Sequence, residues 1–119
     1  MLNNNYVKIK ELVLTEVNEK LLCSAKRNLI LFKNYFSIDK ITFICSDMLK
    51  QVDQTYYNYF DIVLANMPQT PSKTAIRSKH FYNNIIVDKY GGNDGAGLYS
   101  ELINNISKYV VKDFKMFNL

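Results

Sequence analysis

The stretch FDIVLANMPQTP, from Phe60 to Pro71, constrains the fold most, because an apolar run gives way there to a polar residue and a restricted loop. Phe60 to Ala65 predicts a buried strand, and Asn66 follows it directly. Pro68 disfavours helical backbone angles at Met67, so the chain is expected to leave the strand in an extended loop. Enzymes built from alternating strands and helices bind ligands at such strand ends.

Two upstream strands are also predicted to end on acidic residues. Glu16 closes the segment ELVLTE, and Asp47 closes ITFICSD. In parallel sheets the carboxyl ends of the strands lie at one edge, so three successive polar ends suggest a single ligand-binding edge.

The order of the remaining segments predicts an α/β fold with parallel strands. Leu12–Thr15 and Ile41–Cys45 are short apolar runs with strand character, and a short helix is expected from Met48 to about Thr55. Between the two runs, Asn18 is placed to cap a helix through its side-chain oxygen. That helix carries an apolar stripe with three- and four-residue spacing, formed by Leu22, Ala25, Leu29 and Phe32.

The second half of the chain is less regular. Residues 67–89 show no clean period, and a glycine-rich turn then precedes a second helical stripe. Lys115 to Leu119 has the character of a final strand. The stripe is formed by Leu98, Leu102, Ile103 and Ile106.

Composition places the chain among ordinary globular proteins. At 119 residues it is expected to form one domain, with 48% hydrophobic and 22% charged residues. The net charge of +4 is scattered, which permits an anionic partner without requiring one. Cys23 and Cys45 are predicted to be reduced, buried thiols of a cytoplasmic protein, and no apolar run approaches the roughly 20 residues of a membrane span. His80 is the sole histidine, so no metal site is expected.

These motifs together resemble the class I S-adenosylmethionine-dependent methyltransferases, in particular amino-methyltransferases of the release-factor glutamine methyltransferase type. The resemblance runs from about Glu11 to Ile106 and depends on four motifs in the family's order. They are the acidic residue closing ELVLTE with the helix after it, the segment ICSDML, the segment Asn66–Met67–Pro68–Gln69 in place of an Asn-Pro-Pro-Tyr motif, and GGNDG at residues 91–95.

The resemblance implies S-adenosylmethionine as cofactor and a Rossmann-like methyltransferase sheet. Glu16 would then bind the ribose, since a carboxylate suits two adjacent hydroxyl donors, and Asp47 would accept from the adenine amine. Two structural alternatives stay open: Glu16 as a solvated acid at a strand end, and Asp47 as the cap of the helix predicted from Met48.

Asn66 and Met67 carry the expected chemistry of methyl transfer. An amide nitrogen is a poor nucleophile, so the enzyme must hold its N–H groups and aim the nitrogen at the methyl group. The Asn66 side-chain oxygen and the Met67 carbonyl are the candidate acceptors, with Pro68 directing that carbonyl. Gln69 replaces the family's aromatic residue and offers an amide instead of a stacking surface. The alternative is a turn that only ends a strand.

The family's first strand and its glycine-rich turn have no counterpart before Glu11, and Tyr6 to Lys10 look like the end of the helix that follows that turn. The strands expected after Leu119 are also missing. We therefore expect a single partial domain over residues 1–119, in which the pair Leu12–Thr15 and Ile41–Cys45 is separated from the pair containing Phe60–Ala65.

The predicted function is methyl transfer to an amine or amide of a protein, nucleic acid or small molecule. One alternative is a non-catalytic fragment or binding subunit, which would oligomerise or need a partner chain to complete its sheet. The other is a basic nucleic-acid-binding module, although the basic residues are scattered and no RNA- or DNA-binding motif is recognised.

Overall fold

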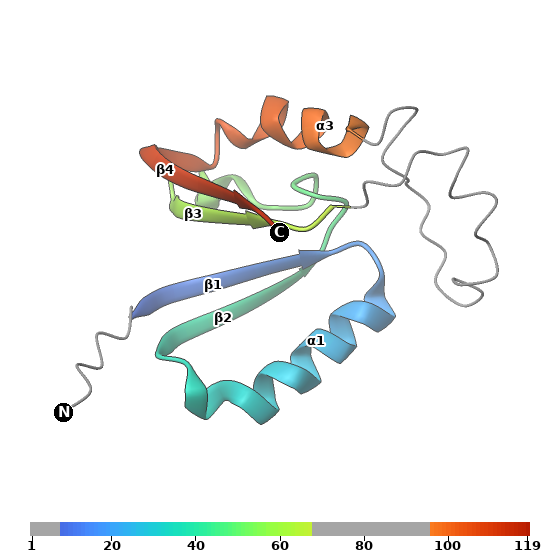
Figure 1. The fold of residues 1–119 in the computed structure, drawn as a ribbon, viewed down its shortest axis with the longest axis vertical. Helices are drawn as coiled ribbons and strands as arrows, with labels where there is room; N and C mark the ends of the chain where they lie inside the picture. The colour runs from blue at the N-terminus through green and yellow to red at the C-terminus, as the bar shows by residue number, and fades with distance from the viewer. Residues whose placement is uncertain (1–7, 68–95) are drawn as a thin grey trace. The chain divides into compact units, whose positions relative to one another are not determined.

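The computed structural model describes residues 8–67 and 96–119, which belong to two compact units, one ending at Gln51 and one beginning at Val52 (Figure 1). The first unit contains β1 (Ile9–Glu16), α1 (Glu19–Phe32), the 3₁₀ turn η1 (Lys33–Tyr35) and β2 (Ile38–Cys45). The second contains the 3₁₀ turn η2 (Gln54–Tyr56), β3 (Phe60–Ala65), α3 (Gly97–Ile106) and β4 (Val110–Asn118). The prediction of one domain over residues 1–119 stays a prediction.

The first unit is a parallel strand pair joined by a helix. β1 pairs with β2 from Ile9, opposite Ile38, to Glu16, opposite Cys45. A parallel pair cannot be closed by a tight turn, and α1 supplies the crossover and packs against both strands (Figure 1). This confirms the α/β class and the parallel pairing predicted from the sequence.

A polar cluster helps to fix the register of β1 on β2. The Glu11 side chain is only 6% exposed, and its Oε1 lies 3.2 Å from Lys40 Nζ. The Thr42 hydroxyl donates to the same oxygen at 2.6 Å. A buried carboxylate needs such partners, so sliding one strand by a residue would leave this charge poorly satisfied.

Helix α1 begins as predicted, with Asn18 as its cap. The Asn18 side-chain oxygen accepts from the backbone N–H groups of Lys20 at 3.0 Å and Leu21 at 3.3 Å. Leu22 is buried, and Ala25 and Leu29 are half-buried, as their spacing predicts. Phe32 departs from the predicted stripe: it is exposed at the end of the helix, with its ring 6.2 Å from that of Tyr35.

The second unit is also a parallel pair with a helix (Figure 1). β3 has the bounds that the sequence predicts, and β4 contains most of the predicted final strand but begins earlier, at Val110. Its core includes one face of α3, two strand residues and two residues just outside the strands, whereas Ile103 of the predicted stripe is exposed. The buried members are Leu98, Leu102, Ile106, Ala65, Val110, Val52 and Tyr109.

Aromatic side chains anchor the segment before β3. The buried Tyr109 hydroxyl donates to the Val52 carbonyl at 3.2 Å, and the Tyr109 ring meets that of Tyr57 edge to face at 5.0 Å. Tyr56 stacks on Phe60 with ring centroids 5.5 Å apart. These contacts hold η2 against the amino ends of β3 and β4.

The helix predicted from Met48 to about Thr55 is wrong. The chain forms turns there and then η2, whose first turn is capped by the Asp53 side chain accepting from Thr55 N–H at 2.8 Å. Met48 has φ of 53°, in the left-handed region, which stops a right-handed helix from starting at this residue.

Two further expectations are wrong. Ile9 and Lys10 begin β1 and are not the end of a helix, since Ile9 N–H donates to the Ser37 carbonyl at 2.8 Å. Cys23 and Cys45 are free thiols as predicted, but both are exposed. Cys23 lies off the buried stripe of α1, and Cys45 is the last residue of β2, in a sheet of two strands.

The strands of the described ranges form two separate two-stranded sheets, as expected for the two pairs. α3 covers one face of the second sheet. On the other face Ile62 and Leu64 are more than half exposed, and Phe117, which is paired with Leu64, is 49% exposed. Such an apolar face normally packs on another layer.

We predict that the first unit depends on one leucine of α1. Leu22 is 4% exposed and Leu31 of the same helix is 72% exposed. Leu22→Ala should lower the free energy of unfolding by about 2–4 kcal/mol, since it removes buried methyl groups and leaves a cavity. Leu31→Ala is the matched control and should change it by less than about 0.5 kcal/mol. Urea denaturation measures both, and equal losses would show that the buried face of α1 is wrongly identified.

Candidate functional site

Glu16 and Asp47 lie at the same edge of the β1–β2 sheet. Glu16 is the last residue of β1 and is paired with Cys45, the last residue of β2. The Ser46 N–H donates to the Glu16 carbonyl at 3.0 Å, and Asp47 follows. Parallel pairing therefore brings together two residues that the sequence predicts at one ligand edge.

The carboxylate of Glu16 has a local role. Its Oε1 accepts from Asn18 N–H at 2.8 Å, across the turn between β1 and α1. The side chain is half-buried, so it is oriented by the turn and not fully solvated. A carboxylate oxygen has two lone pairs, so the same group can also accept from a ligand hydroxyl.

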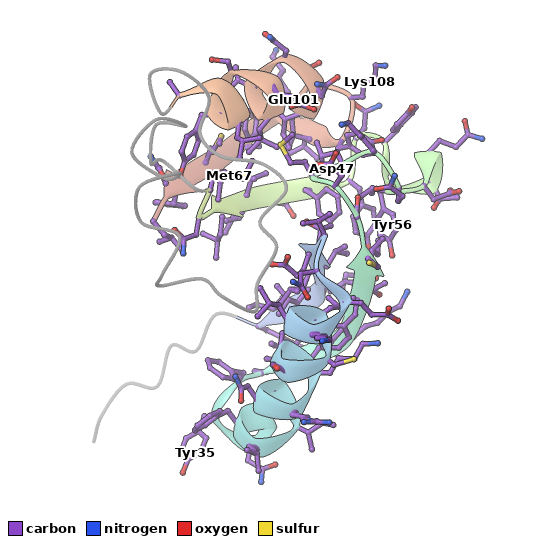
Figure 2. All side chains as sticks on the ribbon, turned by 90° about the vertical axis from the view of Figure 1, so that its right-hand side faces the viewer. Tyr35, Asp47, Tyr56, Met67, Glu101 and Lys108 are labelled. Atoms are coloured by element: carbon purple, nitrogen blue, oxygen red, sulfur yellow. The ribbon has the colours of Figure 1, made fainter. Side chains whose placement is uncertain are left out.

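Asp47 lies in a turn stabilised by side chains. Its Oδ2 is 2.7 Å from Lys50 Nζ, and its N–H donates to Gln51 Oε1 at 2.8 Å. Since no helix begins at Met48, the alternative in which Asp47 caps that helix is wrong. Figure 2 shows Asp47 and Tyr35 at opposite ends of the first unit.

Ser46 supports this turn and was not predicted as a site residue. Ser46 is buried, at 3% exposure. Its hydroxyl donates to the Met48 carbonyl at 2.8 Å and accepts from Gln51 N–H at 3.1 Å. The only sequence signal is a serine between an apolar strand and an acidic residue.

Asn66 and Met67 follow β3 in the second unit. The Asn66 side chain is exposed, and Met67 is half-buried where the ribbon of β3 ends (Figure 2). The Met67 N–H donates to the Tyr99 hydroxyl at 3.1 Å, and that hydroxyl donates to Asn118 Oδ1. Sequence reasoning missed Tyr99 and Asn118. It also placed Pro68 and Gln69 in the site, and these two residues, like the GGNDG motif, lie outside the described residues.

The structure thus assembles the predicted residues in two groups. Glu16 and Asp47 belong to the first unit, while Asn66 and Met67 belong to the second. Each group lies at the carboxyl end of a parallel strand pair, which is where the sequence places it.

The shifted pKa values lie elsewhere, near the start of β3. Thr55 N–H donates to Asp53 and holds the pKa of that carboxyl below its usual value. Burial raises the pKa of the Tyr109 hydroxyl, and Tyr57 adds to the effect. Both residues support the segment before β3, so these shifts reflect structure and do not mark the predicted site.

Other kinds of site find no support in the described ranges. Residues 8–67 and 96–119 contain no cluster of three or more metal-ligating side chains, and neither of their helices has the length and hydropathy to cross a membrane. A shallow hollow runs along α1 and contains none of the predicted site residues. It is lined by Glu19, Lys20, Cys23, Ser24 and Arg27.

We predict that Ser46 determines the geometry of the Asp47 turn. Ser46→Ala should cost about 1–3 kcal/mol, because it removes two part-buried hydrogen bonds, from Gln51 N–H and to the Met48 carbonyl, each worth roughly 0.5–1.5 kcal/mol. Ser24→Ala is the matched control: its hydroxyl bonds the Lys20 carbonyl on the exposed side of α1, and alanine favours the helix. Thermal unfolding compares the two variants. An equal effect would mean that the Ser46 hydroxyl contributes nothing specific.

Comparisons of the chain with models of protein families, with curated protein sequences and with solved structures found no match. The resemblance to amino-methyltransferases therefore depends on Glu16, Asp47, Asn66 and the other motif residues themselves.

Proposed function

We propose that this chain contains the central part of an S-adenosylmethionine-dependent N-methyltransferase of class I. The observation that carries the proposal is the position of Glu16 and Asp47 at the carboxyl edge of one parallel strand pair, beside the turn into α1. Carboxylates on neighbouring strand ends at such an edge suit a nucleoside.

The two carboxylates fit the nucleoside part of the cofactor, because they accept hydrogen bonds. Glu16 is oriented by Asn18 N–H and offers acceptors to the two ribose hydroxyls. Asp47 offers an acceptor to the adenine amine, and its partner Lys50 is half exposed and can turn toward solvent. The cofactor supplies an electrophilic methyl group on a sulfonium, and these two residues hold its nucleoside.

Asn66 and Met67 are proposed to hold the acceptor. The Asn66 side-chain oxygen and the Met67 carbonyl accept the two N–H groups of an amide or amine and so orient the nitrogen that receives the methyl group. By its sequence position Pro68 favours extended backbone at Met67, which would direct that carbonyl, and Gln69 offers an amide where the family has an aromatic residue. Catalysis rests on positioning and exclusion of water, with no strong base.

A second candidate function is that of a non-catalytic fragment or subunit that needs a partner chain. The exposed apolar face formed by Ile62, Leu64 and Phe117 favours this candidate, because a partner chain could supply the layer that buries this face. The two candidates differ in methyl transfer: only the first predicts a turnover that depends on Asn66.

We predict that nucleoside binding depends on Glu16. Adenosine and S-adenosylmethionine, titrated separately, should shift the amide NMR signals of Val17 and Asp47. Glu16→Ala should weaken this binding about tenfold or more, since a hydrogen bond to a charged group is worth roughly 1.5–3 kcal/mol. Glu19→Ala, an exposed acid three residues later, is the control and should bind normally. Shifts that are equal in both variants would exclude Glu16 from the nucleoside site.

We predict that Asn66 affects transfer and not cofactor binding. With labelled S-adenosylmethionine and a glutamine-containing peptide as acceptor, Asn66→Ala should slow single-turnover transfer roughly 100-fold. Cofactor affinity should stay the same, because Glu16 and Asp47 hold the nucleoside. Asn104→Ala, an exposed asparagine of α3, is the control. Absence of transfer in the unmodified chain would favour the second candidate, and normal transfer in Asn66→Ala would leave Asn66 as a turn residue.

A further inference from the structure

We propose that Tyr99 is a positioning residue that fixes the Asn66–Met67 peptide, and with it the two groups that accept the substrate nitrogen. The consequence for methyl transfer rests on the proposed function. The hydrogen bonds themselves do not.

The Tyr99 hydroxyl joins the ends of three elements. It accepts from Met67 N–H at 3.1 Å and donates to the side-chain oxygen of Asn118. Met67 lies just beyond β3, Tyr99 lies in the first turn of α3, and Asn118 is the last residue of β4. Both hydrogen-bonding functions of the hydroxyl are therefore used at the same place.

This contact changes the direction of the chain after β3. The Leu119 N–H donates to the Ala65 carbonyl at 2.9 Å, so the next bond of a regular parallel ladder would run from Met67 N–H to the Leu119 carbonyl. Met67 N–H donates to Tyr99 instead. The strand ends at Ala65 because a side chain from α3 takes the donor that would have continued it.

Fixing the Met67 N–H also fixes the groups on both sides of it. The Asn66 carbonyl and the Met67 N–H belong to one planar peptide, so a single hydrogen bond sets the orientation of the whole unit. The Asn66 side chain branches from one end of this unit and the Met67 carbonyl follows its other end. The Met67 carbonyl is then set by φ and ψ of Met67, and the Asn66 side-chain oxygen by ψ of Asn66 and its two side-chain dihedrals, so each group has few rotations left once the peptide is held.

Tyr99 is suited to hold this position. Its neighbour Leu98 and, one turn later, Leu102 are buried and hold α3 against the sheet. A tyrosine side chain has only two rotatable bonds before its hydroxyl, so little conformational freedom is lost when it is held. A serine or threonine at this position would be too short to reach the same amide.

The first experiment measures hydrogen exchange of the Met67 amide. Tyr99→Phe keeps the ring and removes the hydroxyl, and it should speed exchange at Met67 about tenfold relative to the buried Leu102 amide. Tyr109→Phe removes a hydroxyl that bonds the Val52 carbonyl at the other end of the same strands, and it should leave this ratio unchanged. An unchanged ratio in Tyr99→Phe would overturn the proposal.

The second experiment connects the hydroxyl to transfer. In the single-turnover assay with labelled S-adenosylmethionine and the glutamine peptide, Tyr99→Phe should slow transfer about tenfold with unchanged cofactor affinity. If Met67 exchange were faster but transfer stayed normal in Tyr99→Phe, while Asn66→Ala slowed transfer as predicted, the positioning role would be overturned. Absence of transfer in the unmodified chain would reject the proposed function, and Met67 exchange would then decide alone whether Tyr99 fixes the peptide.

Discussion

Parallel strands cannot be joined by a tight turn, and both units follow from that constraint. In the first unit the crossover is α1, which also contributes the buried Leu22. In the second unit α3 lies on the crossover and covers one face of the β3–β4 sheet. Because each sheet has two strands within the described ranges, none of the large side chains there is completely buried. The stability of each unit therefore depends on a single helix face.

Much of this fold could be predicted from the sequence, because its elements have strong local patterns. The run Phe60–Ala65 gives the exact bounds of β3, and Asn18 gives the start of α1. β1 was predicted too short, since its first residues are charged or exposed and its pairing there is stabilised by contacts such as Lys8 Nζ with Asp39 at 3.3 Å. A methionine gives no indication that its backbone is left-handed, so the turn after β2 was wrongly predicted as a helix.

The residues of the candidate site likewise include some that could be predicted from the sequence and some that could not. Glu16 and Asp47 could be placed because parallel pairing follows from the order of strands and helices. Ser46 and Tyr99 could not be placed, because each acts through specific hydrogen bonds and no periodic sequence pattern predicts such bonds. The bond between Met67 and Tyr99 joins residues 32 positions apart, and only the packing of α3 brings them together. Exposure of Cys45 likewise depends on how many strands the sheet contains, which a local pattern does not reveal.

The separation in sequence between paired strands has a consequence for how the chain folds. In the first unit Ile9 pairs with Ile38, whereas in the second Phe60 pairs with Val110, about 50 positions later. The entropic cost of closing a loop grows only with the logarithm of its length, so this cost differs between the two units by about 0.5 kcal/mol. The order of synthesis matters more: the first unit is complete once Gln51 has emerged from the ribosome, whereas β3 must wait until β4 has been made. Until then β3 is an unpaired apolar strand, the state in which a nascent chain is most exposed to aggregation.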